Sequence, residues 1–183
     1  MYIKNLALMN YRNYESAKIT FSEGINILYG DNAQGKTNIL EAIFVAGTTK
    51  SHRGSKDREI IRFGEDEGHI RADIRKNDMN RRIDMHMKRN KTKGIAIDMG
   101  PIHRSSELLG TMSMVFFSPE DLSIIKDSPS ERRNFMDMEL CQLDKIYISN
   151  LTNYKKVLEQ RNNLLKQISF DRSKADMLSV WDA

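Results

Sequence analysis

The stretch Gly30-Asp31-Asn32-Ala33-Gln34-Gly35-Lys36-Thr37 matches the pattern G-x4-G-K-[ST] at every fixed position. The apolar residues 25–29 before it predict a short strand, and apolar residues at helical spacing predict a helix over residues 37–46. Strand, glycine-rich loop and helix, in this order, form the setting in which such a loop binds nucleotide phosphates. The stretch therefore predicts an α/β fold built around a phosphate-binding loop.

Each fixed residue of this loop has a chemical role. Gly30 and Gly35 let the backbone turn tightly, so that several N–H groups converge on phosphate oxygens at the start of a helix. Lys36 would place its ammonium on the β- and γ-phosphates of ATP, and the Thr37 hydroxyl would be a ligand of Mg²⁺. The predicted nucleotide-binding residues form one run: Gly30, Asp31, Asn32, Ala33, Gln34, Gly35, Lys36, Thr37 and Asn38.

Hydrolysis requires more than the loop. In P-loop enzymes an apolar strand that ends in Asp steadies the Mg²⁺ ion. The nearest approximation here is Ile95-Ala96-Ile97-Asp98, but Met99 follows it where a second carboxylate would be expected. We favour an ordinary surface strand at residues 95–98. The sequence therefore predicts that the loop binds a nucleoside triphosphate, but it does not predict hydrolysis.

The pattern of apolar residues predicts further elements on both sides of the loop helix. We expect a β-rich first part, a short helix, and then a helical part. The expected strands are residues 2–8, 16–21, 69–75, 81–88, 94–98 and 111–117, with the short helix at 105–110. Ser118 and Ser128 have the sequence context of helix starts, and Ser128 has capping-box spacing to Glu131.

The helical part carries a long apolar stripe at spacings of three, four or seven residues. The stripe favours a face packed against a core, or alternatively a coiled-coil arm. Its members are Met136, Leu140, Leu143, Tyr147, Leu151, Tyr154, Leu158, Leu165 and Ile168.

Length and composition set the class of protein. The chain has 183 residues and a formal charge of +4, and none of its apolar runs approaches the length of a membrane span. The N-terminal residues lack the layout of a signal peptide. Cys141 is the only cysteine, which excludes an internal disulfide and is typical of a small, partly buried apolar residue. These features favour a cytoplasmic protein with no membrane partner.

The positive charge is concentrated in one segment, residues 71–93, which we call the basic block. It has nine basic and three acidic residues, whereas the rest of the chain carries a small negative charge. Such a block could follow the phosphates of duplex DNA, or it could be the solvated face of ordinary strands. The candidate DNA-binding residues are Arg71, Arg81, Arg82, Lys88 and Arg89.

Several motifs resemble the RecF family, bacterial recombination and DNA-repair ATPases of the ABC/SMC type. The chain begins Met1-Tyr2-Ile3-Lys4-Asn5-Leu6, continues with Asn10-Tyr11-Arg12-Asn13-Tyr14, and reaches the loop followed by Asn38. Further matches are the segments 50–53, 119–126, 128–137 and 180–182. Asp127 stands where the family usually has glycine, and Asn134 where it often has a third arginine.

The resemblance implies an ABC-type ATPase head with a mixed β-sheet P-loop lobe and a helical second lobe. We place these lobes at residues 1–118 and 119–183, the second being incomplete. The ABC signature and the acidic strand of the family are not found in this sequence, so we expect the N-terminal part of a protein about twice as long. We expect this part to bind ATP and hardly hydrolyse it.

The resemblance also implies partners and contacts. Family members bind double-stranded DNA near single-strand gaps and junctions, act with RecO and RecR to load RecA, and support the SOS response. ATP binding drives dimerisation of two heads, and the complete proteins are DNA-dependent ATPases. Arg12 is a candidate nucleotide contact, although it could be a surface arginine. Glu120 or Asp121 could take the place of the Q-loop residue near Mg²⁺, or could be helix-start carboxylates.

Two other classes of function remain as alternatives. A small nucleotide kinase would share the loop, but it needs an arginine-bearing lid, which the helical C-terminal stretch does not resemble; phosphate transfer to a nucleoside monophosphate would identify it. A non-catalytic interaction module would use the apolar stripe, and its partner binding would not depend on ATP or on Lys36.

Overall fold

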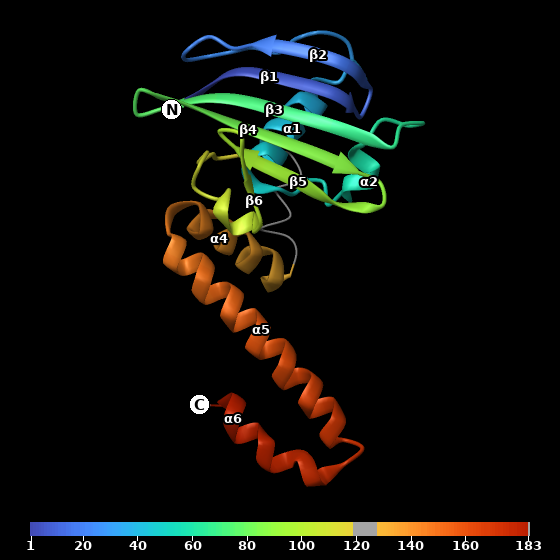
Figure 1. The fold of residues 1–183 in the computed structure, drawn as a ribbon, viewed down its shortest axis with the longest axis vertical. Helices are drawn as coiled ribbons and strands as arrows, with labels where there is room; N and C mark the ends of the chain where they lie inside the picture. Colours follow the sequence, from blue (N-terminus) through green and yellow to red (C-terminus); the bar gives the residue numbers. More distant parts are fainter. Residues whose placement is uncertain (119–127, 183) are drawn as a thin grey trace. The chain divides into compact units, whose positions relative to one another are not determined.

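The computed structural model describes residues 1–118 and 128–182, and Figure 1 shows how their helices and strands are arranged. The chain divides into two compact units, Met1–Pro119 and Glu120–Ala183. Among the helices of the described residues, none has both the length and the apolar character needed to cross a membrane. The predictions for Pro119, Glu120, Asp121 and Asp127 lie outside the described residues.

The first unit is built on one six-stranded sheet with the order β2-β1-β3-β4-β5-β6 (Figure 1). Every neighbouring pair of these strands is antiparallel. Tight turns connect β3 to β4 and β4 to β5, so the sheet is largely a meander. The strands are β1 (Tyr2–Tyr11), β2 (Tyr14–Thr20), β3 (Glu67–Lys76), β4 (Met79–Lys88), β5 (Lys91–Ile97) and β6 (Gly100–Ile102).

Helix α1 (Lys36–Thr48) packs on one face of this sheet. Alternate residues of β1, β3 and β4 point toward it and are buried, as expected for strands with one covered face. Burying each large aliphatic side chain contributes about 1.5–3 kcal/mol. A short helix, α2 (Asp57–Ile60), adds Ile60 to this core. The core includes Leu6, Leu8, Ala42, Val45, Ala46, Ile70, Ala72, Ile74, Ile83, Met85 and Met87.

Most of the predicted elements of the first unit are confirmed, but two predicted strands are wrong. Residues 25–29 and 111–117 lie in no strand. Ile25 and Tyr29 are about nine-tenths exposed, at 89% and 90%. An apolar pattern predicts an extended chain, but a strand also needs a neighbour for its backbone hydrogen bonds, and the described strands provide none for these segments. The predicted helix at 105–110 is a single 3-10 turn, η1 (Ser105–Glu107).

The second unit is helical. It contains α4 (Pro129–Leu143), α5 (Lys145–Ile168), a 3-10 segment η3 (Arg172–Leu178) and α6 (Ser179–Asp182). Asp144 separates the first two helices, and its carboxylate accepts a hydrogen bond from the Ile146 N–H at 2.7 Å, which caps α5. Ser128 precedes α4 as predicted, but the expected capping box is absent because the Ser128 hydroxyl contacts Ser130 instead.

The long apolar stripe of this unit is therefore divided between two helices. Met136, Leu143 and Tyr154, which belong to the predicted stripe, are exposed. Ile148 and Leu164, which are not members of it, are buried. The simple spacing of apolar residues thus fails to identify the buried face, both across the break at Asp144 and within α5 itself.

Candidate nucleotide-binding site

The loop before α1 has the backbone that phosphate binding requires. Gly30, Ala33 and Gly35 have positive φ angles of 138°, 65° and 98°, so the chain turns sharply three times. Helix α1 begins directly after Gly35, whose carbonyl accepts hydrogen bonds from the N–H groups of Asn38 and Ile39 at 2.8 and 3.1 Å. The first turn of α1 contains no acidic residue, so its positive dipole end is not neutralised there.

Lys36 folds back across the loop. Its ammonium donates hydrogen bonds to the carbonyl oxygens of Gly30 and Asp31, at 2.7 and 2.6 Å. Residues 30–34 are exposed, and so is Thr37 on the first turn of the helix. The loop thus holds a positive charge beside helix N–H groups and an exposed hydroxyl, which is the chemistry that suits a triphosphate with a hard cation.

The turn between β1 and β2 supports the loop from one side. The Tyr14 hydroxyl and the Asn13 amide donate to the carbonyl oxygen of Gln34, at 3.3 and 3.4 Å. The Asn38 amide donates to the side-chain oxygen of Asn13 at 2.8 Å. Partial burial raises the pKa of Tyr14, so its hydroxyl stays a donor. The spacing of residues in the sequence does not predict these hydrogen bonds to the loop. Asn13 and Tyr14 do belong to the motif Asn10–Tyr14, on which the resemblance to the RecF family rests.

We expect Gly35→Ala to disrupt the loop. A Cβ at this position would lie 2.6 Å from the Tyr14 hydroxyl and 2.8 Å from the Asn13 amide, in addition to the strain of a φ of 98°. The left-handed strain costs about 1–2 kcal/mol, and the close approaches add to it. Nucleotide affinity, measured by fluorescence titration with a labelled ATP, should fall at least tenfold.

Gly64→Ala is the matched control for this loop variant. Gly64 has a φ of 89°, and a Cβ added there would meet nothing within 4 Å, so this variant suffers the same backbone strain without the close approaches. Equal affinity of both variants for the labelled nucleotide would show that the loop does not depend on the close packing around Gly35.

Arg12 lies in a network of its own. Its Nε and Nη2 atoms donate to the two carboxylate oxygens of Glu41 on α1, at 2.8 and 2.6 Å. Nη2 also donates to the Ser55 hydroxyl at 2.7 Å, and Nη1 donates to the Glu59 carbonyl at 2.9 Å. Four of the five guanidinium N–H groups are therefore used, which leaves one for any other ligand. The predicted contact between Arg12 and a nucleotide stays a prediction.

Glu41 is fully buried, and no pattern in the sequence singles it out. Burial by itself would raise the pKa of its carboxyl group, but hydrogen bonds from Arg12 and Ser51 outweigh burial and hold the pKa below its ordinary value. The Ser51 hydroxyl donates at 2.5 Å. Glu41 is therefore ionised at neutral pH and joins the β1–β2 turn to the middle of helix α1.

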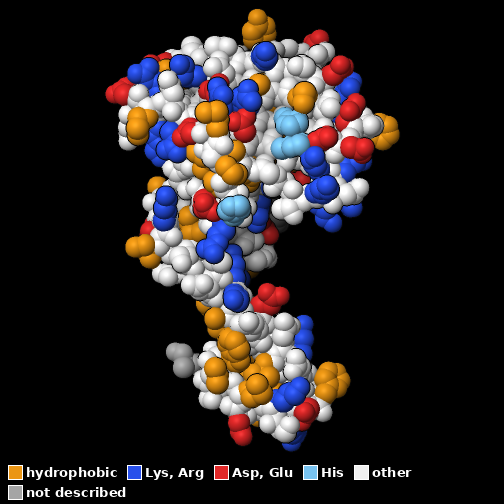
Figure 2. All heavy atoms as spheres, in the orientation of Figure 1, with side chains coloured by type: hydrophobic (Ala, Val, Ile, Leu, Met, Phe, Trp, Pro, Cys, Tyr) orange, Lys and Arg blue, Asp and Glu red, His pale blue; other side chains and the backbone are white. Residues whose placement is uncertain are grey.

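The basic block forms much of β3 and β4, and the structure pairs its cations with carboxylates. On the sheet face opposite α1, which we call the open face, Arg71 contacts Asp84 at 2.6 Å and Arg82 contacts Asp73 at 3.0 Å. Figure 2 shows the basic and acidic side chains intermixed over this unit. The count of charges along the sequence therefore overstates the positive field of this face.

The other three candidate DNA-binding residues also have acidic neighbours. Lys88 lies 3.3 Å from Glu67, and Arg81 lies 2.5 Å from Asp98. Arg89 donates to the Glu65 carbonyl at 2.5 Å and lies 3.9 Å from Asp66. A DNA phosphate would compete with a carboxylate at each of these positions, and the DNA-binding roles stay predictions.

A glycine-rich loop leading into a helix that packs on a β-sheet defines a P-loop nucleotide-binding fold. The chain matches the family described as AAA domain over residues 5–178, and it belongs to that family. The predicted resemblance to RecF is confirmed by curated relatives. The protein named DNA replication and repair protein RecF in Lachnoclostridium phytofermentans is 65% identical over 182 residues, which cover 100% of this chain and 51% of the relative.

A second relative gives the same relation. The protein of the same name in Agathobacter rectalis is 61% identical over 182 residues, covering 100% of this chain and 50% of the relative. The chain thus spans about half the length of the curated relatives it matches.

Solved structures confirm the predicted fold class, an ABC/SMC-type ATPase head. A structure described as the recombination mediator protein RecF-ATP in the RecFOR pathway has a TM-score of 0.94 at 39% identity, covering 99% of this chain and 49% of that one. A structure from work on SMC ATPases has a TM-score of 0.62 at 21% identity, covering 75% of this chain and 99% of that one. The second likeness concerns the fold alone.

Proposed function

We propose that this chain is the ATP-binding part of a RecF-type protein of DNA replication and repair. The observation that carries the proposal is the loop of residues 30–37, whose three positive φ angles, helix N-terminus and inward-folded Lys36 suit a triphosphate. The likeness to the RecF-ATP structure, at 39% identity over nearly the whole chain, supports ATP as the nucleotide.

The chain's own residues would act on ATP by binding and orientation. Helix N–H groups and Lys36 would neutralise the β- and γ-phosphates, because charge-assisted hydrogen bonds at a helix N-terminus favour anions. The Thr37 hydroxyl, exposed on the first turn of α1, would hold Mg²⁺, which prefers oxygen ligands. When bound, Mg²⁺ would offset the negative charge of the triphosphate.

The proposal extends to partners. We infer that the complete protein binds double-stranded DNA near single-strand gaps, dimerises when its heads bind ATP, and acts with RecO and RecR to promote RecA loading. The solved relative described as a recombination mediator in the RecFOR pathway supports these partners. The cations of the basic block on β3 and β4 supply the residues that would contact DNA phosphates.

The 183-residue chain should bind ATP with little or no turnover. The loop supplies binding, but the sequence has no match to the apolar strand ending in paired carboxylates that hydrolysis requires. The measurement is binding of a fluorescent ATP alongside phosphate release, with and without duplex DNA. Turnover that disappears in Lys36→Ala would contradict the binding-only expectation, and phosphate transfer to a nucleoside monophosphate would show a kinase instead.

Replacing Arg81, Arg82, Lys88 and Arg89 together by alanine should flatten the salt dependence of duplex-DNA binding. The slope of log K against log salt should fall by about 0.9 for each DNA phosphate that is no longer neutralised. A matched control removes four cations of the second unit, Lys156, Lys166, Arg172 and Lys174. An unchanged slope in the first variant, or an equal decrease in the second, would exclude the basic block as the DNA-binding surface.

A further inference from the structure

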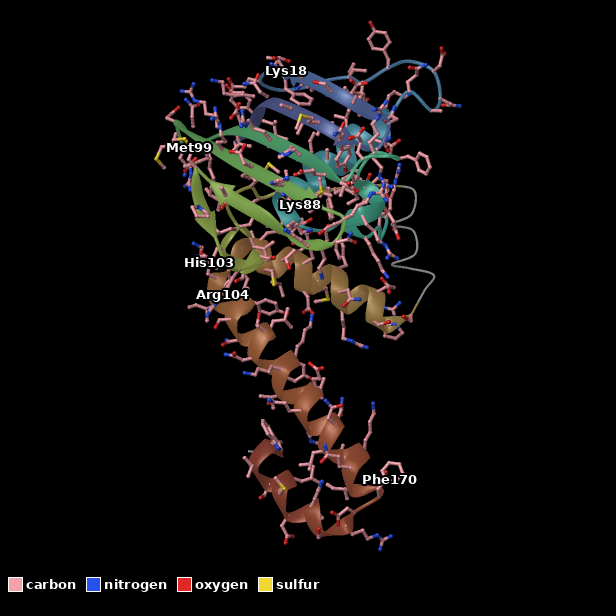
Figure 3. The ribbon with its side chains drawn as sticks, turned by 45° about the vertical axis from the view of Figure 1, so that its right-hand side comes forward. Lys18, Lys88, Met99, His103, Arg104 and Phe170 are labelled. Carbon is pink, nitrogen blue, oxygen red and sulfur yellow. The ribbon has the colours of Figure 1, made fainter. Side chains whose placement is uncertain are left out.

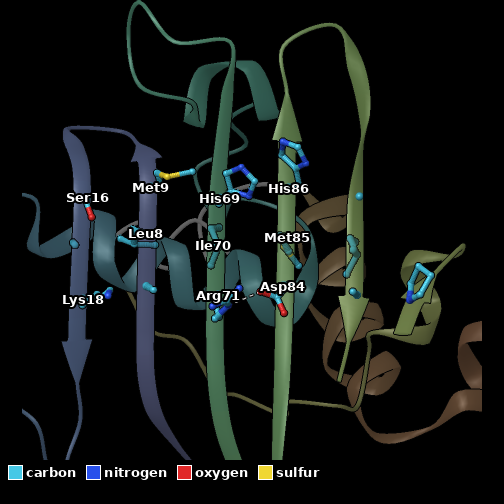
Figure 4. Close-up of a pocket in the computed structure, with 16 residues that line it drawn as sticks. Leu8, Met9, Ser16, Lys18, His69, Ile70, Arg71, Asp84, Met85 and His86 are labelled. Atoms are coloured by element: carbon cyan, nitrogen blue, oxygen red, sulfur yellow. Dashed lines mark hydrogen bonds and ion pairs between the residues drawn. The ribbon is translucent and has the colours of Figure 1, made fainter. Parts of the chain in front are cut away.

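Three side chains with metal-binding atoms meet on the open face of the sheet. Glu67 and His69 lie two residues apart on β3, so they point to the same side of the sheet. His86 on β4 is the direct cross-strand partner of His69. Figure 4 shows the two imidazoles side by side on neighbouring strands, above the row that contains Arg71 and Asp84.

The ligand atoms of these residues are close enough to share one ion. One carboxylate oxygen of Glu67 and one ring nitrogen from each histidine all lie within 4.8 Å of one another. The imidazole rings are stacked, with centroids 4.0 Å apart and an interplanar angle of 18°. His86 also contacts the Glu67 carboxylate through Nε2. Small rotations of the side chains would bring all three atoms to about 2.0–2.2 Å from a common centre.

We propose that Glu67, His69 and His86 form a binding site for a divalent transition-metal ion, with Zn²⁺ as the best fit. Two imidazoles with one carboxylate are ligands that zinc accepts, whereas Mg²⁺ and Ca²⁺ prefer oxygen ligands throughout. Three protein ligands would leave further coordination positions for water.

The surroundings of the cluster agree with this assignment. A hollow of about 490 Å³ runs over this part of the open face, and its lining includes Gly94 and Ala96, which are too small to cover the imidazoles. An ion and its waters therefore have access from solvent.

The charge of a neighbouring lysine should weaken metal binding at this cluster, so removing that charge tests the proposal. The Lys88 ammonium lies 3.3 Å from the Glu67 carboxylate, where it competes with any cation for the same oxygen. Removing this charge while keeping an apolar chain of similar length, in Lys88→Met, should raise the affinity for Zn²⁺. A purely structural role of the two histidines would not predict such an increase.

The test is calorimetric titration of the nucleotide-free 183-residue chain with Zn²⁺, with Co²⁺ absorption as a second readout. We expect one ion per chain, and at least a tenfold loss of affinity in His69→Ala, His86→Ala and Glu67→Gln, since even outer-shell changes cost about 10–100-fold. His103→Ala, at an exposed histidine that follows β6 (Figure 3), and Cys141→Ser are controls that should bind Zn²⁺ as the parent chain does.

The outcomes separate clearly. Glu67→Gln keeps both imidazoles and the shape of the carboxylate, and thermal melts without metal verify that each variant is folded. Saturating Zn²⁺ should raise the melting temperature of the parent chain, and the same Zn²⁺ concentration should raise that of the His69→Ala variant less. Binding that survives in all three cluster variants, no binding by the parent chain, or lower affinity in Lys88→Met would each overturn the proposal.

Discussion

Replacing Lys36 by alanine should remove most of the affinity of the chain for ATP. In the structure its ammonium bonds to the carbonyl oxygens of Gly30 and Asp31, and phosphate oxygens would take over these hydrogen bonds. A charge-assisted hydrogen bond contributes about 1.5–3 kcal/mol, so losing two of them corresponds to a decrease of about a hundredfold or more. Equilibrium titration with a fluorescent ATP in the presence of Mg²⁺ measures this loss directly.

Lys18→Ala is the control for the lysine variant. Lys18 is exposed on β2 (Figure 3), so the control removes the same charge from another place on the same unit. Lys36→Arg adds a second comparison: a planar guanidinium does not reproduce a compact ammonium at a tight loop, so this variant should restore little of the affinity. Affinity in Lys36→Ala that equals that of Lys18→Ala would contradict the assignment of the loop as the triphosphate site.

Replacing Glu41 by glutamine should produce the largest loss of stability among single variants at this site. The change leaves the Arg12 guanidinium, whose side chain is 19% exposed, without its carboxylate partner. Removing one member of a fully buried ion pair costs about 3–5 kcal/mol, so we expect a loss at the lower end of this range for a partly exposed arginine. The free energy of unfolding, measured by denaturant titration at neutral pH, should fall by about this amount.

The depressed pKa of Glu41 gives this prediction a pH signature. Because the folded state holds the carboxylate ionised, the ion pair stabilises the protein above the ordinary carboxyl pKa of about 4.3. This stabilisation is lost as the pH falls through the lower folded pKa, so the difference between the parent chain and Glu41→Gln should shrink in acid. Glu15→Gln, at a mostly exposed carboxylate, should change the stability by less than about 0.5 kcal/mol. A Glu41→Gln effect as small as this control would show that the ion pair does not stabilise the fold.

The sequence predicts those features whose signals are local. The loop at residues 30–37 and the helix after it follow from fixed residue types at fixed spacing, and the β3–β4–β5 meander follows from apolar alternation with turn residues near positions 78 and 90. Residues 25–29 show the limit of such signals, because their apolar pattern says nothing about whether a hydrogen-bonding neighbour exists.

The features that sequence analysis missed depend on residues far apart in the chain. Arg12 and Glu41 are 29 positions apart, and their ion pair exists because the β1–β2 turn meets helix α1. The balance of charge on the open face depends on strand register, which sets Arg71 opposite Asp84 and Asp73 opposite Arg82. A one-residue slip would turn these side chains to the other face, so a linear count of charges could not reveal the pairing.

The β1–β2 turn also has a thermodynamic consequence for ligand binding. It holds Gln34 and Asn38 at the loop through Asn13 and Tyr14, while Arg12 anchors the same turn to Glu41. A loop that is already held in place loses little conformational entropy when a ligand arrives, so more of the interaction energy remains as affinity. The turn thus preorganises the loop, and loosening it would weaken binding even if every phosphate-contacting residue were kept.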